Sequence, residues 1–230
     1  DISLADAERR ELDDYHSFND FFTRRLDASA RPLPEQPHHL VCPADGIVSQ
    51  LGRIEDDLLM QAKGHQYSLN SLAGPTGAGL QHGDFCTIYL APSNYHRIHL
   101  PVDGKLVETR AIPGALFSVN GVTEADIPGL FCRNERLVCR FETAHGPMLL
   151  VLVGALIVAS IETVWPGPVS PYSQEVVTQH DQGFQRGDEI GRFLLGSTVI
   201  CCFAKGAVEL ADHLAAGSVV RLGETLAQPA

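Results

Sequence analysis

The bond between Gly196 and Ser197 is a place where neighbouring residues could react with the chain itself. It stands directly before a β-branched run, Thr198–Ile200. The Ser197 hydroxyl can attack the Gly196 carbonyl, which no side chain shields, and shift the acyl group from nitrogen to oxygen. β-Elimination of that ester and hydrolysis of the resulting dehydroalanine would leave a pyruvoyl group and release ammonia. Since Gly-Ser-Thr before a strand is more often a simple turn, this interpretation needs a base elsewhere in the chain.

Two histidines three residues apart, His96 and His99, are candidates for that base. They share a face if their segment is helical and diverge if it is extended. Histidine transfers protons near neutral pH, but it is also a common zinc ligand and often an ordinary core or surface residue. No third ligand stands at a recognised metal spacing, so the pattern favours acid–base chemistry while leaving a structural role open.

Asp45 is a carboxylate that could orient such a base, but its context has a simpler explanation. It lies in Pro43–Gly46, and Asp-Gly is a common hairpin turn. The similar stretch Pro101–Gly104 favours the turn, because the same dipeptide recurs where a turn would suffice. Spacing alone therefore does not assign Asp45 to a catalytic site.

Composition indicates an acidic globular protein of 230 residues with a net charge of −11. This charge argues against nucleic-acid binding, and any attraction to an anionic bilayer would have to be local. The longest apolar run, 148–161, is too short for a membrane-spanning helix and too rich in Val and Ile to favour one. The six cysteines have neither metal nor disulfide spacing, so we expect reduced core thiols, with Cys201 and Cys202 on opposite faces of a strand.

The elements predicted from the pattern give a mainly β (α+β) fold. Residues 1–34 are expected to be helical, because apolar residues recur there at helical spacing; the aromatic face around 18–22 could pack on the domain or face a membrane. Residues 35–230 are expected to form a β-rich catalytic domain, a sandwich or barrel with a duplicated hairpin unit. Short helices are predicted near 68–72, 123–126 and 208–214.

Eight stretches of the chain, between about Phe18 and about Phe203, resemble the phosphatidylserine decarboxylase family in that family's order. They are 18–24, 43–46, 62–65 with 67–69, 95–99, 117–120, 134–136, 153–155 with 160–163, and 191–198. Any one match is unremarkable, but eight in register are specific.

The resemblance implies a pyruvoyl-dependent enzyme that converts phosphatidylserine to phosphatidylethanolamine and carbon dioxide. It implies self-cleavage between Gly196 and Ser197 into chains 1–196 and 197–230. The cofactor would be the pyruvoyl group formed from Ser197, with no metal and no pyridoxal phosphate.

The same likeness implies a role for each candidate side chain. Asp45 would orient His99, His99 would deprotonate Ser197, and His96 would serve the decarboxylation step. The enzyme would act peripherally at a membrane surface on the cytoplasmic side, with no nucleic-acid partner. Its large and small chains would stay together as a heterodimer and dimerise further.

Two other classes of protein share part of these features. A lipoyl- or biotinyl-type carrier module has similar turn-rich β texture, but it needs a lysine at a hairpin tip, and none lies between Trp165 and Ala204. A zinc hydrolase could use His96 and His99 as ligands. Neither alternative explains the Gly-Ser bond.

Overall fold

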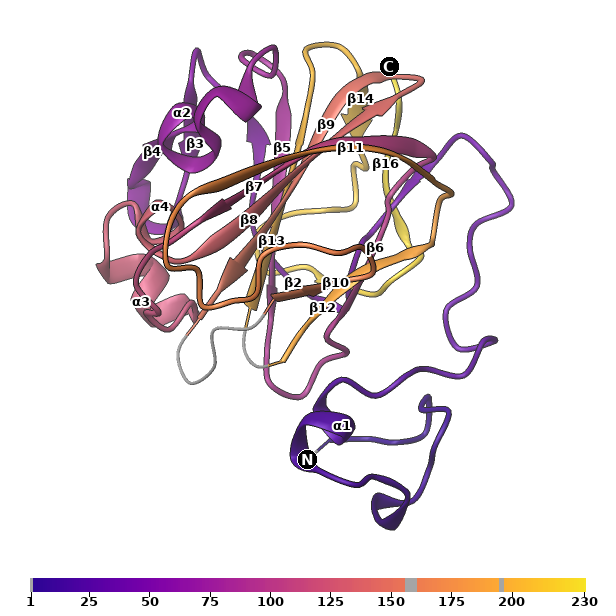
Figure 1. Ribbon diagram of the computed structural model, residues 1–230. Helices are drawn as coiled ribbons and strands as arrows, with labels where there is room; N and C mark the ends of the chain where they lie inside the picture. Colours follow the sequence, from indigo (N-terminus) through magenta and orange to yellow (C-terminus); the bar gives the residue numbers. More distant parts are fainter. Residues whose placement is uncertain (1, 156–160, 195–196) are drawn as a thin grey trace.

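The computed structural model describes residues 2–155, 161–194 and 197–230, and an eight-stranded antiparallel sheet forms its centre (Figure 1). The strand order is β11-β7-β8-β9-β13-β5-β2-β15. These strands are β2 (Gly46–Arg53), β5 (Asp84–Leu90), β7 (Gly104–Ile112), β8 (Arg136–Thr143), β9 (Gly146–Gly154), β11 (Val176–Phe184), β13 (Ser197–Phe203) and β15 (Val219–Val220). The predicted mainly β fold is confirmed.

Strand β13 lies inside this sheet and is buried on both faces. It pairs with β5 on one side and β9 on the other, and all seven of its residues are buried. Val199 and Cys201 belong to one hydrophobic cluster, while Ile200 and Cys202 belong to a second. The two neighbouring cysteines therefore point to opposite faces, as expected from the period of a strand. All six cysteines lie within the described residues and none forms a disulfide.

Each face of the large sheet has its own cover (Figure 1). Over the face of Ile200 lie short helices and a hairpin: α2 (Leu69–Ala73), α3 (Gly121–Asp126), α4 (Leu130–Arg133), η2 (Ala62–Gly64), η3 (Gly74–Gly77), β3 (Leu58–Met60) and β4 (Gln66–Ser68). Over the other face lie two small sheets, one of β1 (Leu40–Val41), β16 (Thr225–Pro229) and β14 (Val208–Leu210), the other of β10 (Ile161–Thr163), β12 (Glu189–Phe193) and β6 (Arg97–His99). Strands β6 and β12 carry the segments that matter for the site.

The N-terminal segment runs outside the sheets (Figure 1) and is much less helical than predicted. Between residues 2 and 34 the structure has only η1 (Leu12–Asp14) and α1 (Phe18–Phe22) as helices. Ser17 caps α1 by accepting from the Asp20 N–H, but the chain leaves the helix after one turn. The apolar spacing instead serves loop packing, which buries Phe22 while Phe18 stays 60% exposed.

Two of the other three predicted helices are confirmed, as α2 and α3. The helix predicted at 208–214 is wrong, because Val208 and Leu210 alternate inward from strand β14 and pair with β16. The repeated Asp-Gly stretches both precede strands, β2 and β7. Each of these strands is second from one edge of the large sheet, and the duplication of a hairpin unit stays a prediction.

A first prediction concerns Gly46, where β2 passes close to β5. A Cβ at this position would lie 2.4 Å from the Tyr89 carbonyl oxygen and 2.7 Å from the Ile88 Cγ2 atom. Overpacking of this kind costs about 1–3 kcal/mol, so Gly46→Ala should lower the free energy of unfolding measured in urea by that amount. Gly121→Ala is the matched control: nothing lies within 4 Å of its added Cβ, at the start of α3, so stability should stay equal or rise slightly. Equal stability of the two variants would contradict this account of the strand approach.

Candidate active site

Ser197 begins β13 and is fully buried, with its Oγ atom lacking a hydrogen-bond partner among the described residues. Its backbone pairs with Leu90 of β5 and with Gly154 of β9, so its position is fixed from both sides. A buried hydroxyl without a partner is costly, and the described residues hold four more of them, on Ser49, Tyr67, Thr87 and Thr198. What sets Ser197 apart is its place as the first residue of β13, directly after Gly196. The other half of the predicted reactive bond, Gly196, lies outside the described residues.

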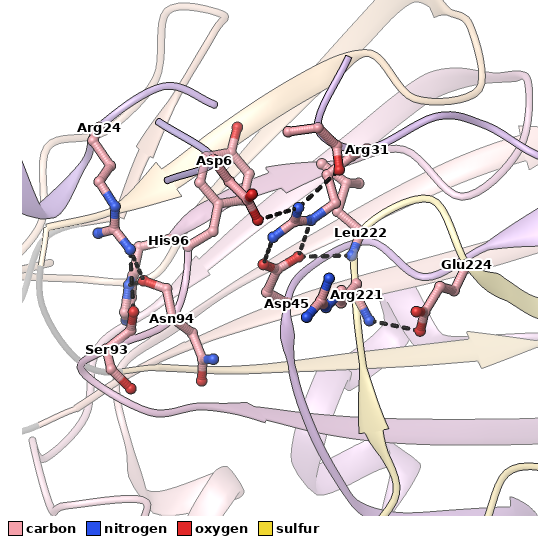
Figure 2. Close-up of polar contacts among 12 residues, drawn as sticks. Asp6, Arg24, Arg31, Asp45, Ser93, Asn94, His96, Arg221, Leu222 and Glu224 are labelled. Carbon is pink, nitrogen blue, oxygen red and sulfur yellow. Dashed lines mark hydrogen bonds and ion pairs between the residues drawn. The ribbon is translucent and has the colours of Figure 1, made fainter. Parts of the chain in front are cut away.

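Asp45 is a buried carboxylate held by an arginine from the N-terminal segment (Figure 2). Arg31 donates from Nη2 to one carboxylate oxygen at 2.5 Å and from Nε to the other at 3.1 Å. The Leu222 N–H donates to Asp45 at 2.8 Å. This pairing raises the pKa of Arg31. Strands β1 and β2 belong to different sheets, so the predicted hairpin-turn role of the Asp45-Gly46 dipeptide is wrong.

His99 ends β6 with both ring nitrogens engaged. Nδ1 lies 2.7 Å from the Gly187 carbonyl oxygen and Nε2 lies 2.9 Å from the Tyr95 hydroxyl. Since a carbonyl only accepts, Nδ1 carries the proton and Nε2 accepts from Tyr95. Burial is the main cause that lowers the pKa of His99, and the Gly187 carbonyl opposes it.

A cavity of about 280 Å³ brings the surroundings of Asp45 and His99 together. His99 and Tyr95 line it, as do Arg31 and Leu222, the two partners of Asp45. The backbone contributes as well, because the His99 N–H donates to the Pro43 carbonyl at 2.9 Å, two residues before Asp45. His99 therefore lines the cavity itself, whereas Asp45 is connected to it through Arg31 and Leu222, and no hydrogen bond joins the His99 and Asp45 side chains in the described structure.

His96 is the more deeply buried of the two histidines, with no exposed surface. Its Nδ1 donates to the Asn94 carbonyl at 2.9 Å, and its Nε2 has no partner among the residues described. The Phe22 ring lies on it at 4.0 Å between centroids. Burial lowers the pKa of His96 to about 4, so the ring is neutral at pH 7 with a free lone pair on Nε2.

The extended geometry of β6 separates the two histidines, the second of the two outcomes considered from their spacing. The backbone of His96 is tied to the strand that leads towards Ser197, because the Phe193 N–H donates to the His96 carbonyl at 2.9 Å. No hydrogen bond joins either histidine to Ser197 in the part of the chain that the structure describes. That part also holds no cluster of three or more His, Cys, Asp or Glu residues suited to a metal ion, so the zinc hydrolase finds no ligand set there.

Sequence reasoning assigned no role to three residues that complete this site: Arg24, Arg31 and Tyr95. Arg31 was visible only as the start of an Arg-Pro pair that ends a helical pattern. Arg24 and Tyr95 lie inside two of the family-like stretches, 18–24 and 95–99, and this was their only signal. Arg31 and Arg24 contact residues that are at least 14 positions away in the sequence, and no local pattern reveals such contacts.

A second prediction follows from the pKa of His96. An unfolded histidine has a pKa near 6.5, so below that pH the unfolded chain binds a proton that the folded chain rejects. Stability should thus be unaffected above pH 6.5 and fall between pH 6.5 and about 4, by about 2.5 kcal/mol at pH 4.5.

Urea unfolding at pH 7 and pH 4.5 tests this in a Ser197→Ala chain, where no break at residue 197 complicates the transition. His96→Gln should lose about 2.5 kcal/mol less than its parent on acidification. His38→Gln, at an exposed histidine, should behave as the parent does. The same pH dependence in all three chains would show that His96 is not held neutral by burial.

Comparisons with known proteins agree with this site. A model of the family described as phosphatidylserine decarboxylase matches residues 18–228. The chain is 50% identical to the phosphatidylserine decarboxylase proenzyme of Psychrobacter cryohalolentis over 229 residues, which cover 98% of this chain and 83% of that protein. It is 50% identical to the proenzyme of Pseudomonas entomophila over 239 residues (100% and 83%) and 49% identical to that of Pseudomonas aeruginosa strain LESB58 over 238 residues (99% and 82%). The chain therefore belongs to the phosphatidylserine decarboxylase family, as a self-cleaving proenzyme of a carboxy-lyase that converts phosphatidylserine to phosphatidylethanolamine.

Proposed function

We propose that the chain cuts itself between Gly196 and Ser197 and that Ser197 becomes the pyruvoyl group of the decarboxylase. The observation that carries this proposal is the buried Ser197 Oγ, which has no partner among the described residues and sits at the end of a strand fixed on both sides. A hydroxyl that makes no hydrogen bond within the described fold is free to attack a neighbouring carbonyl. The products would be chains 1–196 and 197–230.

Asp45 and His99 supply the base for this cleavage in our proposal. The assignment is supported by the cavity that His99 shares with the Asp45 partners Arg31 and Leu222, and by the Nδ1 proton of His99. A carboxylate orients an imidazole through that proton and leaves Nε2 as the base. In the described conformation Gly187 and Tyr95 hold the ring, and Arg31 holds Asp45. Activation of Ser197 therefore requires His99 to exchange these partners.

His96 serves the decarboxylation step in this proposal. A pyruvoyl group supplies the electron-withdrawing carbonyl that decarboxylation needs, so neither a metal nor pyridoxal phosphate is required. The free Nε2 of His96 can take a proton from the ammonium group of the substrate and return it to the α-carbon after carbon dioxide leaves. Its low pKa keeps the ring neutral at pH 7, which is the form that can accept a proton.

Peripheral membrane association on the cytoplasmic side completes the proposal. The described residues include no helix that could cross a membrane. Leu12 is 66% exposed and Phe18 is 60% exposed on the N-terminal segment, where they could enter the apolar edge of a bilayer. With a net charge of −11, such local apolar contacts would have to outweigh repulsion from anionic lipids. The cleaved large and small chains are proposed to stay together and to dimerise further.

A third prediction tests the cleavage point. Purified wild-type protein should give two fragments on a denaturing gel, and the small one should lack an ordinary amino terminus by mass spectrometry. Ser197→Ala removes the attacking hydroxyl and should remain a single chain of 24.9 kDa. Ser173→Ala, at an exposed serine, should be cut as the wild type is. A continuous chain in active enzyme would refute the proposal.

A fourth prediction separates the two histidines. His99→Asn should slow the appearance of fragments by roughly 10²–10⁴-fold, the range for loss of a general base. His96→Asn should be cut at a normal rate and then release carbon dioxide from phosphatidylserine roughly 10²–10⁴-fold more slowly. Gel analysis over time and a carbon dioxide assay on the same samples measure both steps. If His96→Asn blocks cleavage while His99→Asn does not, the two roles are exchanged.

A further inference from the structure

Arg24 is a buried cation with no carboxylate beside it in the described structure. It is 4% exposed, and its Nη2 donates to the Ser93 and Asn94 carbonyls at 3.1 and 3.3 Å. Its Nε and Nη1 atoms are buried with no acceptor among the described residues. Burial lowers the pKa of Arg24, and the charge of Asp45 partly opposes this. The Arg24 guanidinium also lies 5.5 Å from the centre of the Phe21 ring, a contact that leaves its N–H groups without acceptors.

A second buried arginine shows what a purely structural one looks like in this fold. Arg136 is equally deep, and it also lacks a carboxylate partner in the described structure. Its three guanidinium nitrogens nevertheless all donate to backbone carbonyls, those of Leu72, Cys132, Asn134 and Ser71, at 2.7–2.9 Å. Arg24 has two nitrogens left over, so the fold alone does not account for it.

The Arg24 guanidinium lies beside His96 (Figure 2). Arg24 and His96 both donate to the Asn94 carbonyl, so this one oxygen holds the guanidinium and the imidazole side by side. The positive charge of Arg24 also contributes to the low pKa of His96. His96 itself has an unpartnered Nε2. The two unused nitrogens of Arg24 are donors suited to an anionic group, whereas the neutral Nε2 of His96 is an acceptor suited to the ammonium group of the same substrate.

Phosphatidylserine carries two anionic groups, a phosphodiester and a carboxylate. An arginine on the carboxylate would stabilise the ground state, because the negative charge leaves that group as carbon dioxide forms. An arginine on the phosphodiester has no such cost, since its charge does not change in the reaction. Only three covalent bonds separate the phosphorus from the α-carbon, so a phosphodiester at Arg24 sets the α-carbon near His96.

We propose that Arg24 binds the phosphodiester of phosphatidylserine and thereby places the headgroup against His96. This extends the proposed role of His96 and rests on it. The stretch 18–24 is then part of the substrate site, with the Phe22 ring covering His96 and Arg24 holding the phosphate. The ligand class is a phosphodiester on a short amino-alcohol.

Calorimetry on the uncut Ser197→Ala chain tests this without the cleavage chemistry. The probe is glycerophosphoethanolamine, which has the phosphodiester but no carboxylate, and L-serine, with the carboxylate but no phosphate, is the comparison. In this background Arg24→Met should weaken binding of glycerophosphoethanolamine at least tenfold, as expected for loss of a charged hydrogen bond. It should leave binding of L-serine unchanged. Arg25→Met, at the exposed neighbouring arginine, is the control and should retain the parent affinity for glycerophosphoethanolamine.

Stability gives the second readout. Because the buried guanidinium has no ion-pair partner in the described structure and leaves two nitrogens without acceptors, Arg24→Met should unfold in urea at the same or a higher midpoint than its parent. A lower midpoint would assign Arg24 a structural role and overturn the proposal. Three binding results would also overturn the proposal: no binding of glycerophosphoethanolamine by the parent, equal binding of it by Arg24→Met, or a loss of L-serine binding alone. None of these outcomes depends on whether Ser197 is the cleavage point.

Discussion

The pairing of β13 with both β5 and β9 is the constraint on which the rest of the site depends. Seven consecutive residues, Ser197–Phe203, are paired on both sides and buried on both faces. Such a strand cannot shift by one residue without turning its apolar side chains to the wrong clusters. The first residue of the strand is therefore held in a fixed place, and that residue is the serine proposed to react.

The same pairing explains how a chain cut directly before its central strand β13 can remain folded. Residues 197–230 provide β13 in the centre of the large sheet, β15 at its edge, and β14 and β16 in a small sheet with β1. Of these strands, β13, β15 and β16 pair with strands from before residue 197, namely β5 and β9, β2, and β1, while β14 pairs with β16. A break before Ser197 removes one covalent link and none of these ladders, so the small fragment would remain an integral part of the structure.

The N-terminal segment is part of the site despite lying outside the sheets. It supplies Phe22 over His96, Arg24 beside the same ring and Arg31 to Asp45. A buried pair such as Arg31–Asp45 adds little net stability, but removal of one partner leaves the other charge uncompensated. The pair therefore fixes where the segment docks more than how stably the domain folds.

Local pattern predicted the parts of the structure that local physics determines. The β-branched runs around Ile88, Val151 and Ile200 became the inner strands, and alternation along β13 placed Cys201 and Cys202 correctly. The helical spacing before residue 30 was misleading, since its apolar residues pack as loops against distant parts of the chain. Asp45 was read as a hairpin turn because its true partner, Arg31, lies across a stretch of irregular chain.

Tertiary contacts decide the remaining features, and the two histidines illustrate this. Their spacing allowed both side chains to share one face of a helix or to diverge from an extended segment. The extended strand β6 makes them diverge. His99 then meets Tyr95 and Gly187 at a cavity, whereas His96 is fully buried against the Phe22 ring. His96 and His99 therefore lie in different environments although they are only three residues apart. Neither the composition nor the hydrophobic periodicity of the sequence could predict which environment each would have.

The electrostatics around His96 connect binding to proton transfer. Burial and the charge of Arg24 both favour the neutral ring. A phosphodiester held by Arg24 would offset that charge, so the proton affinity of Nε2 would rise when the headgroup is in place. The ring would then accept a proton most readily when a substrate ammonium group is beside it. An arginine left uncompensated by the fold would in this way make the base respond to the presence of its substrate.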